Sequence, residues 1–141
     1  RIPHSQGAFR ERIVVGDFQC EPVGDTVSLG EAACCEPLSV ALHAVQQAGS
    51  LTGKRVLVTG SGPIGALVVA AARYAGALEV VATDLHDAAL KKATEMGATR
   101  TVNVSQAPGL AAEEFTAEKG YFDVAIECTG AGGVKIEEHT S

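Results

Sequence analysis

The sequence predicts an α/β fold built around a parallel sheet. Short runs of β-branched and other apolar residues alternate with longer stretches that carry the apolar spacing of a helix. Because two parallel strands need a long crossover between them, this alternation predicts successive strand–helix–strand units with right-handed connections. A second observation agrees with the first: the apolar run at 54–60 leads directly into a glycine-rich turn and then into an Ala- and Val-rich helical stretch.

The elements are expected in a simple alternating order. Irregular chain over 1–29, with a short strand at 11–15, precedes a helix over 31–48. Pro37 fits only the first turn of a helix, so this helix is expected to begin near it and to end at Gly49. The remaining elements are expected as strands at 54–60, 79–84, 100–104 and 121–128 and as helices at 63–75, 86–96 and within 110–119.

The glycine-rich turn has the spacing of a dinucleotide-binding fingerprint, Gly60-Ser61-Gly62-Pro63-Ile64-Gly65. Gly60 allows the tight turn, Gly62 lets a pyrophosphate approach the backbone, and Gly65 lets the helix pack closely on the strand. The helix that begins at Pro63 and Ile64 presents N–H groups and a partial positive charge to the phosphates. A mere tight turn is the alternative. The flanking strand and helix favour a Rossmann-type doubly wound sheet with strand order 3-2-1-4.

An acidic residue follows this turn at the distance that such a site requires. Asp84 lies nineteen positions after Gly65, at the end of the strand expected at 79–84. A carboxylate there can accept hydrogen bonds from both ribose hydroxyls and repels a 2′-phosphate. No Lys or Arg occurs in the next six residues, so NAD is favoured over NADP. The alternative is that Asp84 caps the helix over 86–96, for which Asp87 is the other candidate.

The fourth expected strand ends in Thr129 and Gly130. Because the carboxyl ends of parallel strands meet at one edge of the sheet, these residues are expected beside the switch point, where the nicotinamide end of a cofactor passes. A plain turn is the alternative. The tail at 134–141 is too short to add the two further strands of a complete doubly wound sheet, so the sheet is expected to be incomplete, with four strands.

Composition narrows the class of protein. The 141 residues are 46% hydrophobic and 20% charged, which suits one globular domain. The net charge is −6 and no Lys/Arg cluster occurs, so nucleic acid is not an expected partner. No apolar run reaches the roughly 18–20 residues of a membrane helix, so no membrane partner is expected either. The four cysteines form no CxxC motif and favour reduced thiols and a cytoplasmic location.

Several stretches resemble the zinc-type medium-chain alcohol and polyol dehydrogenases. The block Glu36-Pro37-Leu38-Ser39-Val40 resembles the sorbitol dehydrogenase branch of that family, and 45–49 and 117–124 are similar to members that act on sugar acids. The resemblance runs from about residue 5 to 131. Its other matching stretches are 7–11, 41–44, 53–58, 60–65, 96–98 and 126–130.

The resemblance implies that the intact protein transfers hydride from a secondary alcohol of a polyol or sugar acid to NAD, with zinc, as a homo-oligomer. It implies that 1–29 is the end of a GroES-like catalytic domain and that 30–133 is a partial NAD-binding domain. The chain lacks an initiator Met and the family's Cys and His zinc ligands. It is therefore expected to be an excised piece that contains no catalytic residue and is inactive alone. Ala89 stands where the family often has Arg, which leaves one adenine-side contact in question.

Other polar residues keep two interpretations each. The resemblance places Glu36 in the zinc sphere of the intact enzyme; otherwise it is an acid that the helix dipole favours in a first turn. Cys34 and Cys35 lack a distant ligand pair and are expected as small buried thiols rather than as a metal site. His43 is expected to be packed in the core rather than to relay protons.

A second function class remains beside the enzyme. The same fingerprint would serve a non-catalytic module that binds or senses a dinucleotide. A Cys and a Gly-His-Glu segment upstream in the parent protein would favour the enzyme, because these residues are the family's zinc ligands.

Overall fold

The computed structural model describes residues 7–106 and 120–130. The chain divides into two compact units, residues 1–33 and 34–141, close to the boundary expected near residue 30. The helix expected within 110–119 and the tail at 134–141 lie outside the described residues.

The first unit has little regular structure in its described part. It contains a 3₁₀ turn, η1 (Asp17–Gln19), and a short helix, α1 (Leu29–Ala33). The strand expected at 11–15 is wrong: Val14 is fully exposed there, and none of the described segments pairs with this stretch to form a ladder. At α1, Ser28 Oγ accepts a hydrogen bond from the Glu31 N–H (3.2 Å), and Glu31 accepts one from the Ser28 N–H (2.8 Å), which forms a capping box.

The single helix expected over 31–48 is instead two helices. Helix α2 (Cys35–Gln47) covers most of that range, and α1 ends just before it. Pro37 gives the physical reason for the separation from α1. Proline has no N–H and cannot donate to the carbonyl of the residue four positions earlier, Ala33. The first such bond forms one residue later, where the Leu38 N–H donates to the Cys34 carbonyl at 3.0 Å. Gly49, with a φ of 75°, follows the end of α2, as the sequence predicts.

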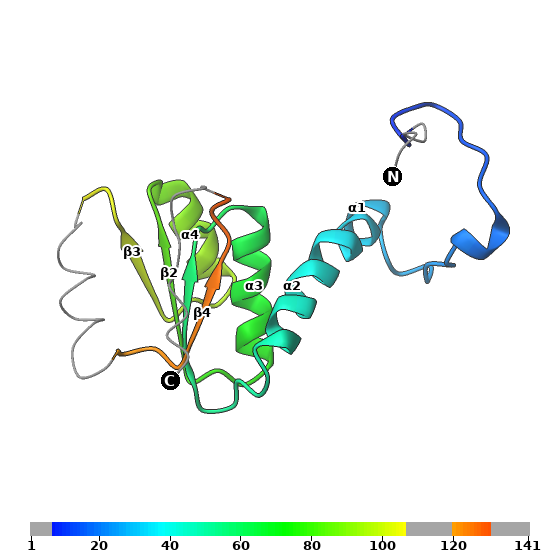
Figure 1. Cartoon of the computed structure of the whole chain (residues 1–141). Helices are drawn as coiled ribbons and strands as arrows, with labels where there is room; N and C mark the ends of the chain where they lie inside the picture. The colour runs from blue at the N-terminus through cyan, green and yellow to red at the C-terminus, as the bar shows by residue number, and fades with distance from the viewer. Residues whose placement is uncertain (1–6, 107–119, 131–141) are drawn as a thin grey trace. The chain divides into compact units, whose positions relative to one another are not determined.

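The second unit is a four-stranded parallel sheet in the order β3-β2-β1-β4, which confirms the predicted topology (Figure 1). Two helices form crossovers between its strands, and α2 packs against the first of them. The strands are β1 (Arg55–Thr59), β2 (Glu79–Asp84), β3 (Arg100–Asn103) and β4 (Val124–Glu127), and the crossover helices are α3 (Pro63–Tyr74) and α4 (Asp87–Glu95).

The core lies between the sheet and these helices. Val56 and Val58 alternate with half-buried residues along β1 and are completely buried, so one side of the pleat faces the helices. Small side chains on the helices let the layers approach closely. The buried cluster joins Val56, Val58, Val80 and Ala82 of the sheet to Val68, Val69 and Ala72 of α3, Ala93 of α4, and Ala41 and Val45 of α2.

The start of α3 packs closely against the turn at the end of β1. A Cβ atom placed on Gly65 would lie 1.9 Å from the Gly60 carbonyl oxygen, a distance that no side chain permits. A Cβ on Gly62, in the same turn, would meet nothing within 4 Å. Gly65 is therefore required by packing, whereas the absence of a side chain at Gly62 leaves open space.

These two glycines give a matched prediction for stability. We expect Gly65→Ala to lower the free energy of unfolding by at least about 3 kcal/mol, because the new methyl group must push the turn away from α3. Urea denaturation followed by circular dichroism measures this loss.

Gly62→Ala is the control and should cost at most about 1 kcal/mol, the usual penalty for alanine at a helix N-cap. Equal losses for the two variants would contradict this interpretation of the turn.

Candidate functional site

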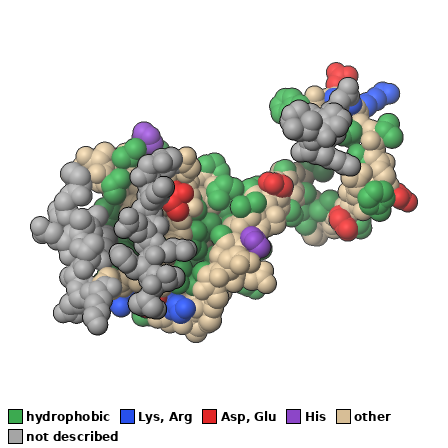
Figure 2. Space-filling view, in the orientation of Figure 1, with side chains coloured by type: hydrophobic (Ala, Val, Ile, Leu, Met, Phe, Trp, Pro, Cys, Tyr) green, Lys and Arg blue, Asp and Glu red, His purple; other side chains and the backbone are tan. Residues whose placement is uncertain are grey.

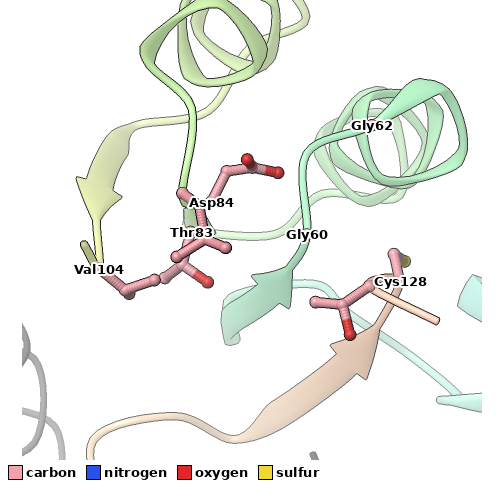
Figure 3. Close-up of a pocket in the computed structure, with 8 residues that line it drawn as sticks. Gly60, Gly62, Thr83, Asp84, Val104 and Cys128 are labelled. Carbon is pink, nitrogen blue, oxygen red and sulfur yellow. The ribbon is translucent and has the colours of Figure 1, made fainter. Parts of the chain in front are cut away.

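A cavity of about 320 Å³ opens at the carboxyl edge of the sheet (Figure 3). Its walls come from the turn after β1, the ends of β2 and β4, and the residue that follows β3. The lining residues are Gly60, Gly62, Thr83, Asp84, Leu85, Val104, Cys128 and Thr129. The structure thus brings together the glycine turn, the acid and the end of the fourth strand, which the sequence analysis identified separately.

Backbone contacts fix the glycine turn. Gly60 has a φ of 82°, and its N–H donates to the Thr83 carbonyl at 2.8 Å. A Cβ on Gly60 would lie 2.8 Å from the backbone of Cys128 and of Thr129, so only glycine fits between β1 and β4. Gly62 is the N-cap of α3, so the turn aims the positive end of that helix dipole at the carboxyl edge of the sheet.

Asp84 holds the turns after β1 and β2 together. Its Oδ2 accepts from the Ser61 N–H (2.8 Å) and its Oδ1 from the His86 N–H (2.9 Å). Partial burial raises the pKa of this carboxyl. Hydrogen bonds from the backbone of Ser61, His86 and Leu85, with the charge of His86, outweigh burial and leave the pKa below its usual value. Asp84 is therefore a fixed carboxylate at neutral pH.

The capping interpretation of the two acids is wrong. The N-cap of α4 is His86, and Asp87 is the first residue of the helix. Asp84 lies too far ahead of the helix to cap it, and its carboxylate instead accepts from the N–H of the cap residue. The Asp84 carboxylate is therefore held beside the cavity by backbone N–H groups and does not cap α4.

The end of β4 forms the opposite wall. Glu127 Oε1 accepts from the Thr129 N–H at 2.5 Å and from the Thr129 hydroxyl. Those two bonds and one from the Gly130 N–H lower the pKa of Glu127. Thr129 lines the cavity, while Gly130, with a φ of 63°, is not among the lining residues.

Cys128, which lies between Glu127 and Thr129 in the chain, is half-buried. Its N–H donates to the Thr59 carbonyl at 2.7 Å, which continues the β1–β4 pairing beyond the strand end. Burial, followed by the nearby charge of Glu127, raises the pKa of its thiol, so the group stays neutral. Cys128 is therefore a wall of the cavity rather than a nucleophile.

Three expectations about α2 need correction. His43, Cys34 and Cys35 are exposed rather than buried. The positions of α2 that face the core are Ala41 and Val45, and His43 lies two residues, roughly 200° around the helix, from each. The helix itself is present as expected, but His43 lies on the side of α2 away from the core.

Glu36 is exposed in the first turn of α2. Within 7–106 and 120–130, no three His, Cys, Asp or Glu side chains come together in a way that could hold a metal ion. The four cysteines are all unpaired.

Sequence reasoning missed several parts of the site. Ser61 is 2% exposed, and its hydroxyl donates to the Thr83 carbonyl at 3.3 Å, so it anchors the turn from inside. The sequence signal that could have identified Ser61 was its position between Gly60 and Gly62. Leu85 and Val104 add apolar walls, and no local pattern marked them because their proximity depends on strand order.

A parallel sheet with a glycine turn, a helix N-terminus and a fixed acid at its carboxyl edge defines a Rossmann-type dinucleotide-binding domain. The zinc-binding dehydrogenase family model matches residues 63–135 of the 141. The chain belongs to this family.

The chain is also similar to individual dehydrogenases. The chain is 42% identical over 129 residues to L-idonate 5-dehydrogenase (NAD(P)(+)) of Escherichia coli K12, a match that covers 92% of the chain and 37% of the relative. The crystal structure of L-idonate 5-dehydrogenase from E. coli superposes with a TM-score of 0.85 over the same shares of each chain, with 42% identity. Human sorbitol dehydrogenase is 41% identical over 114 residues, 79% of the chain and 32% of the relative.

A third structure bears on the cofactor. A zinc-binding dehydrogenase from Sinorhizobium meliloti, crystallised with NADP bound, has a TM-score of 0.63 and 39% identity, and the match covers 70% of this chain and 29% of that one. The chain spans only about a third of the length of these relatives.

Asp84 gives a pH-dependent prediction. Because its folded-state pKa is lowered, its contribution to stability is complete above about pH 5 and is lost as pH falls through that pKa. We expect Asp84→Asn to cost about 2 kcal/mol at pH 7, since an Asn amide can accept from only one of the two N–H groups.

The cost should shrink as pH falls below the ordinary pKa of an aspartate toward the lowered folded-state pKa of Asp84, because the unfolded chain then takes up a proton that the folded carboxylate does not. Urea denaturation of both proteins between pH 7 and pH 3 measures it. Asp25→Asn, the same change at an exposed acid of the first unit, is the control and should cost little at any pH. A cost for Asp84→Asn that stays constant with pH would contradict this role.

Proposed function

We propose that this chain is the coenzyme-binding part of an NAD-dependent zinc dehydrogenase that oxidises a secondary alcohol of a polyol or sugar acid. The observation that carries the proposal is the cavity at the carboxyl edge, where the glycine turn and the N-terminus of α3 lie beside the fixed Asp84 carboxylate. The similarity to L-idonate 5-dehydrogenase supports an L-idonate-like substrate. It agrees with the resemblance of 45–49 and 117–124 to that enzyme.

The residues present fit a dinucleotide. Nothing lies within 4 Å of the place where a Gly62 side chain would point, so a pyrophosphate has room against the backbone. Pro63 has no N–H, so Ile64 and Gly65 supply the first backbone donors of α3. Asp84 would accept from the adenosine ribose, and Thr129 and Gly130 lie toward the nicotinamide end.

These positions separate what the cofactor and zinc would supply in the reaction from what the described residues would do. When bound, the nicotinamide supplies the acceptor for a hydride, and zinc supplies a Lewis acid for the alcohol. The described residues orient and enclose the cofactor, and none of them takes up the substrate proton. In the intact enzyme we place Glu36 in the zinc sphere, with the other ligands outside these residues.

The NAD preference rests on Asp84. Both of its oxygens are held by backbone N–H groups, so the carboxylate cannot easily turn away from a 2′-phosphate. A phosphate there would meet a fixed negative charge at short range. One relative is named for both NAD and NADP, and another binds NADP, so use of both cofactors is the competing outcome.

The ligand that we propose is a small molecule. On the face drawn in Figure 2, the described Lys and Arg side chains are scattered rather than gathered into a basic patch. No helix in the described ranges is long and apolar enough to cross a membrane. Homo-oligomeric assembly of the intact enzyme and a cytoplasmic location stay predictions.

Calorimetric titration of the chain with NADH and NADPH tests the proposal. We expect NADH to bind at least about tenfold more tightly than NADPH, because only NADPH brings a phosphate against Asp84. Gly62→Ala should weaken NADH binding by about tenfold or more, since its methyl group occupies the space of the pyrophosphate.

Gly24→Ala is the control, because a Cβ there also meets nothing within 4 Å and lies in the first unit. No heat with either cofactor would refute the proposed function. Tighter binding of NADPH would refute the role given to Asp84 and leave dinucleotide binding in place.

A further inference from the structure

We propose that Asn103 is a positioning residue whose side chain joins the end of β3 to the start of α4 and so fixes the apolar wall that receives the base of the dinucleotide. The inference rests on the proposed function and deepens it, since Asn103 does not itself line the cavity. It concerns how the base end of the cavity keeps its shape before a ligand binds.

Two apolar residues continue the cavity wall beside Asp84. Leu85 directly follows β2, Val104 directly follows β3, and both line the cavity (Figure 3). Leu85 is 58% exposed, so a large apolar side chain lies at the surface next to the acid that we assign to the adenosine ribose. Because the base is attached to that ribose, a flat aromatic ring is the part of the ligand that suits this apolar wall.

Backbone pairing between β2 and β3 ends just before these two residues. Asp84 and Asn103 are the last pair in register, and one further bond runs from the Val104 N–H to the Asp84 carbonyl at 3.1 Å. Among the described strands, β3 has a neighbour on one side only. The chain that follows β3 therefore depends on side-chain contacts to hold it against the chain that follows β2.

The Asn103 side chain makes these contacts in two directions. Its Nδ2 donates to Asp87 Oδ1 at 2.5 Å, which ties the end of β3 to the first residue of α4. Its Oδ1 accepts from the Ser105 N–H at 3.0 Å and from the Ser105 hydroxyl at 2.6 Å. Val104 lies between the two bonded residues of this turn, and Leu85 lies two residues before Asp87. One amide therefore restrains both wall residues.

The chemistry of the partners allows only one orientation of the Asn103 amide. A carboxylate can only accept hydrogen bonds and a backbone N–H can only donate, so Nδ2 must face Asp87 and Oδ1 must face Ser105. The second oxygen of Asp87 accepts from Gln106 Nε2 at 3.4 Å, which adds a weaker bond between the same two segments. A wall that is held in this way needs less ordering when the base binds, which favours affinity.

The test compares ligands that carry the base with one that lacks it. ADP and NADH carry adenosine, whereas inorganic pyrophosphate can use only the glycine turn and the start of α3. We expect Asn103→Ala to weaken binding of ADP and NADH about tenfold, because the wall must then be ordered on binding. Binding of pyrophosphate should change by less than about twofold. Calorimetric titration of the 141-residue chain with each ligand measures the three constants.

A reversed pair tests the bond between Asn103 and Asp87. Asn103→Asp keeps an acceptor for Ser105 but sets a second carboxylate against Asp87, so it should weaken ADP at least as much as Asn103→Ala. The double variant Asn103→Asp/Asp87→Asn exchanges donor and acceptor at unchanged net charge, so ADP affinity should return to within about twofold of the wild type.

Two controls separate this bond from charge and from the loss of Asp87. Adding Asp87→Asn to Asn103→Ala should restore nothing, because no partner then remains for the new amide. Gln47→Glu adds a negative charge at the end of α2, as Asn103→Asp does at the end of β3, and should leave all three ligands unaffected.

The other outcomes overturn the inference. Unchanged ADP affinity in Asn103→Ala, or equal losses for ADP and pyrophosphate, would remove the positioning role, while ADP binding by the wild type leaves the proposed function intact. If Asn103→Ala does not fold, the comparison of Asn103→Asp with the reversed pair decides, and a pair that recovers no affinity refutes the inference. If the wild type binds neither NADH nor ADP, the proposed function fails and this inference fails with it.

Discussion

The contact between Gly65 and the Gly60 carbonyl is the constraint on which the rest of the second unit depends. Because no Cβ fits there, α3 begins directly on the end of β1, and its first N–H groups point at the carboxyl edge of the sheet. The same approach brings the small residues of α3 onto Val56 and Val58 and closes the core. Packing and ligand recognition therefore use a single backbone geometry, so a substitution that spoils one spoils both.

Around that contact, polar groups already have hydrogen-bond partners, which fix their orientation before a ligand binds. The two carboxylates that flank the turn are held by backbone N–H groups rather than by mobile cations. Backbone donors cannot swing away, so the orientation of both acids is set before a ligand arrives. Less ordering is then left to be done on binding, which is how preorganised sites gain affinity.

The fold and the centre of the site could be predicted because their signals are local. The fingerprint at 60–65 and Asp84 follow from short-range spacing, and the strand order follows from the Rossmann pattern that the fingerprint indicates. The failures depend on long-range facts. A strand at 11–15 needs a partner that the described chain does not provide, and the environment of His43 depends on which side of α2 meets α3. Leu85 and Val104 were missed because their place in the cavity wall depends on the order of the strands.

One consequence of the Gly60 environment concerns the time course of folding. The backbone of Cys128 and Thr129 closes on Gly60 across nearly half the length of the chain, and Glu127 is paired in register with Thr59. Contacts this distant in sequence form only after their loop-closure entropy has been met, which slows parallel sheets relative to local structure. The β1–α3–β2 part can assemble from neighbouring segments, but the cavity has no second wall until β4 docks. We therefore expect the site to form late in the folding of this unit and to be lost early when β4 detaches.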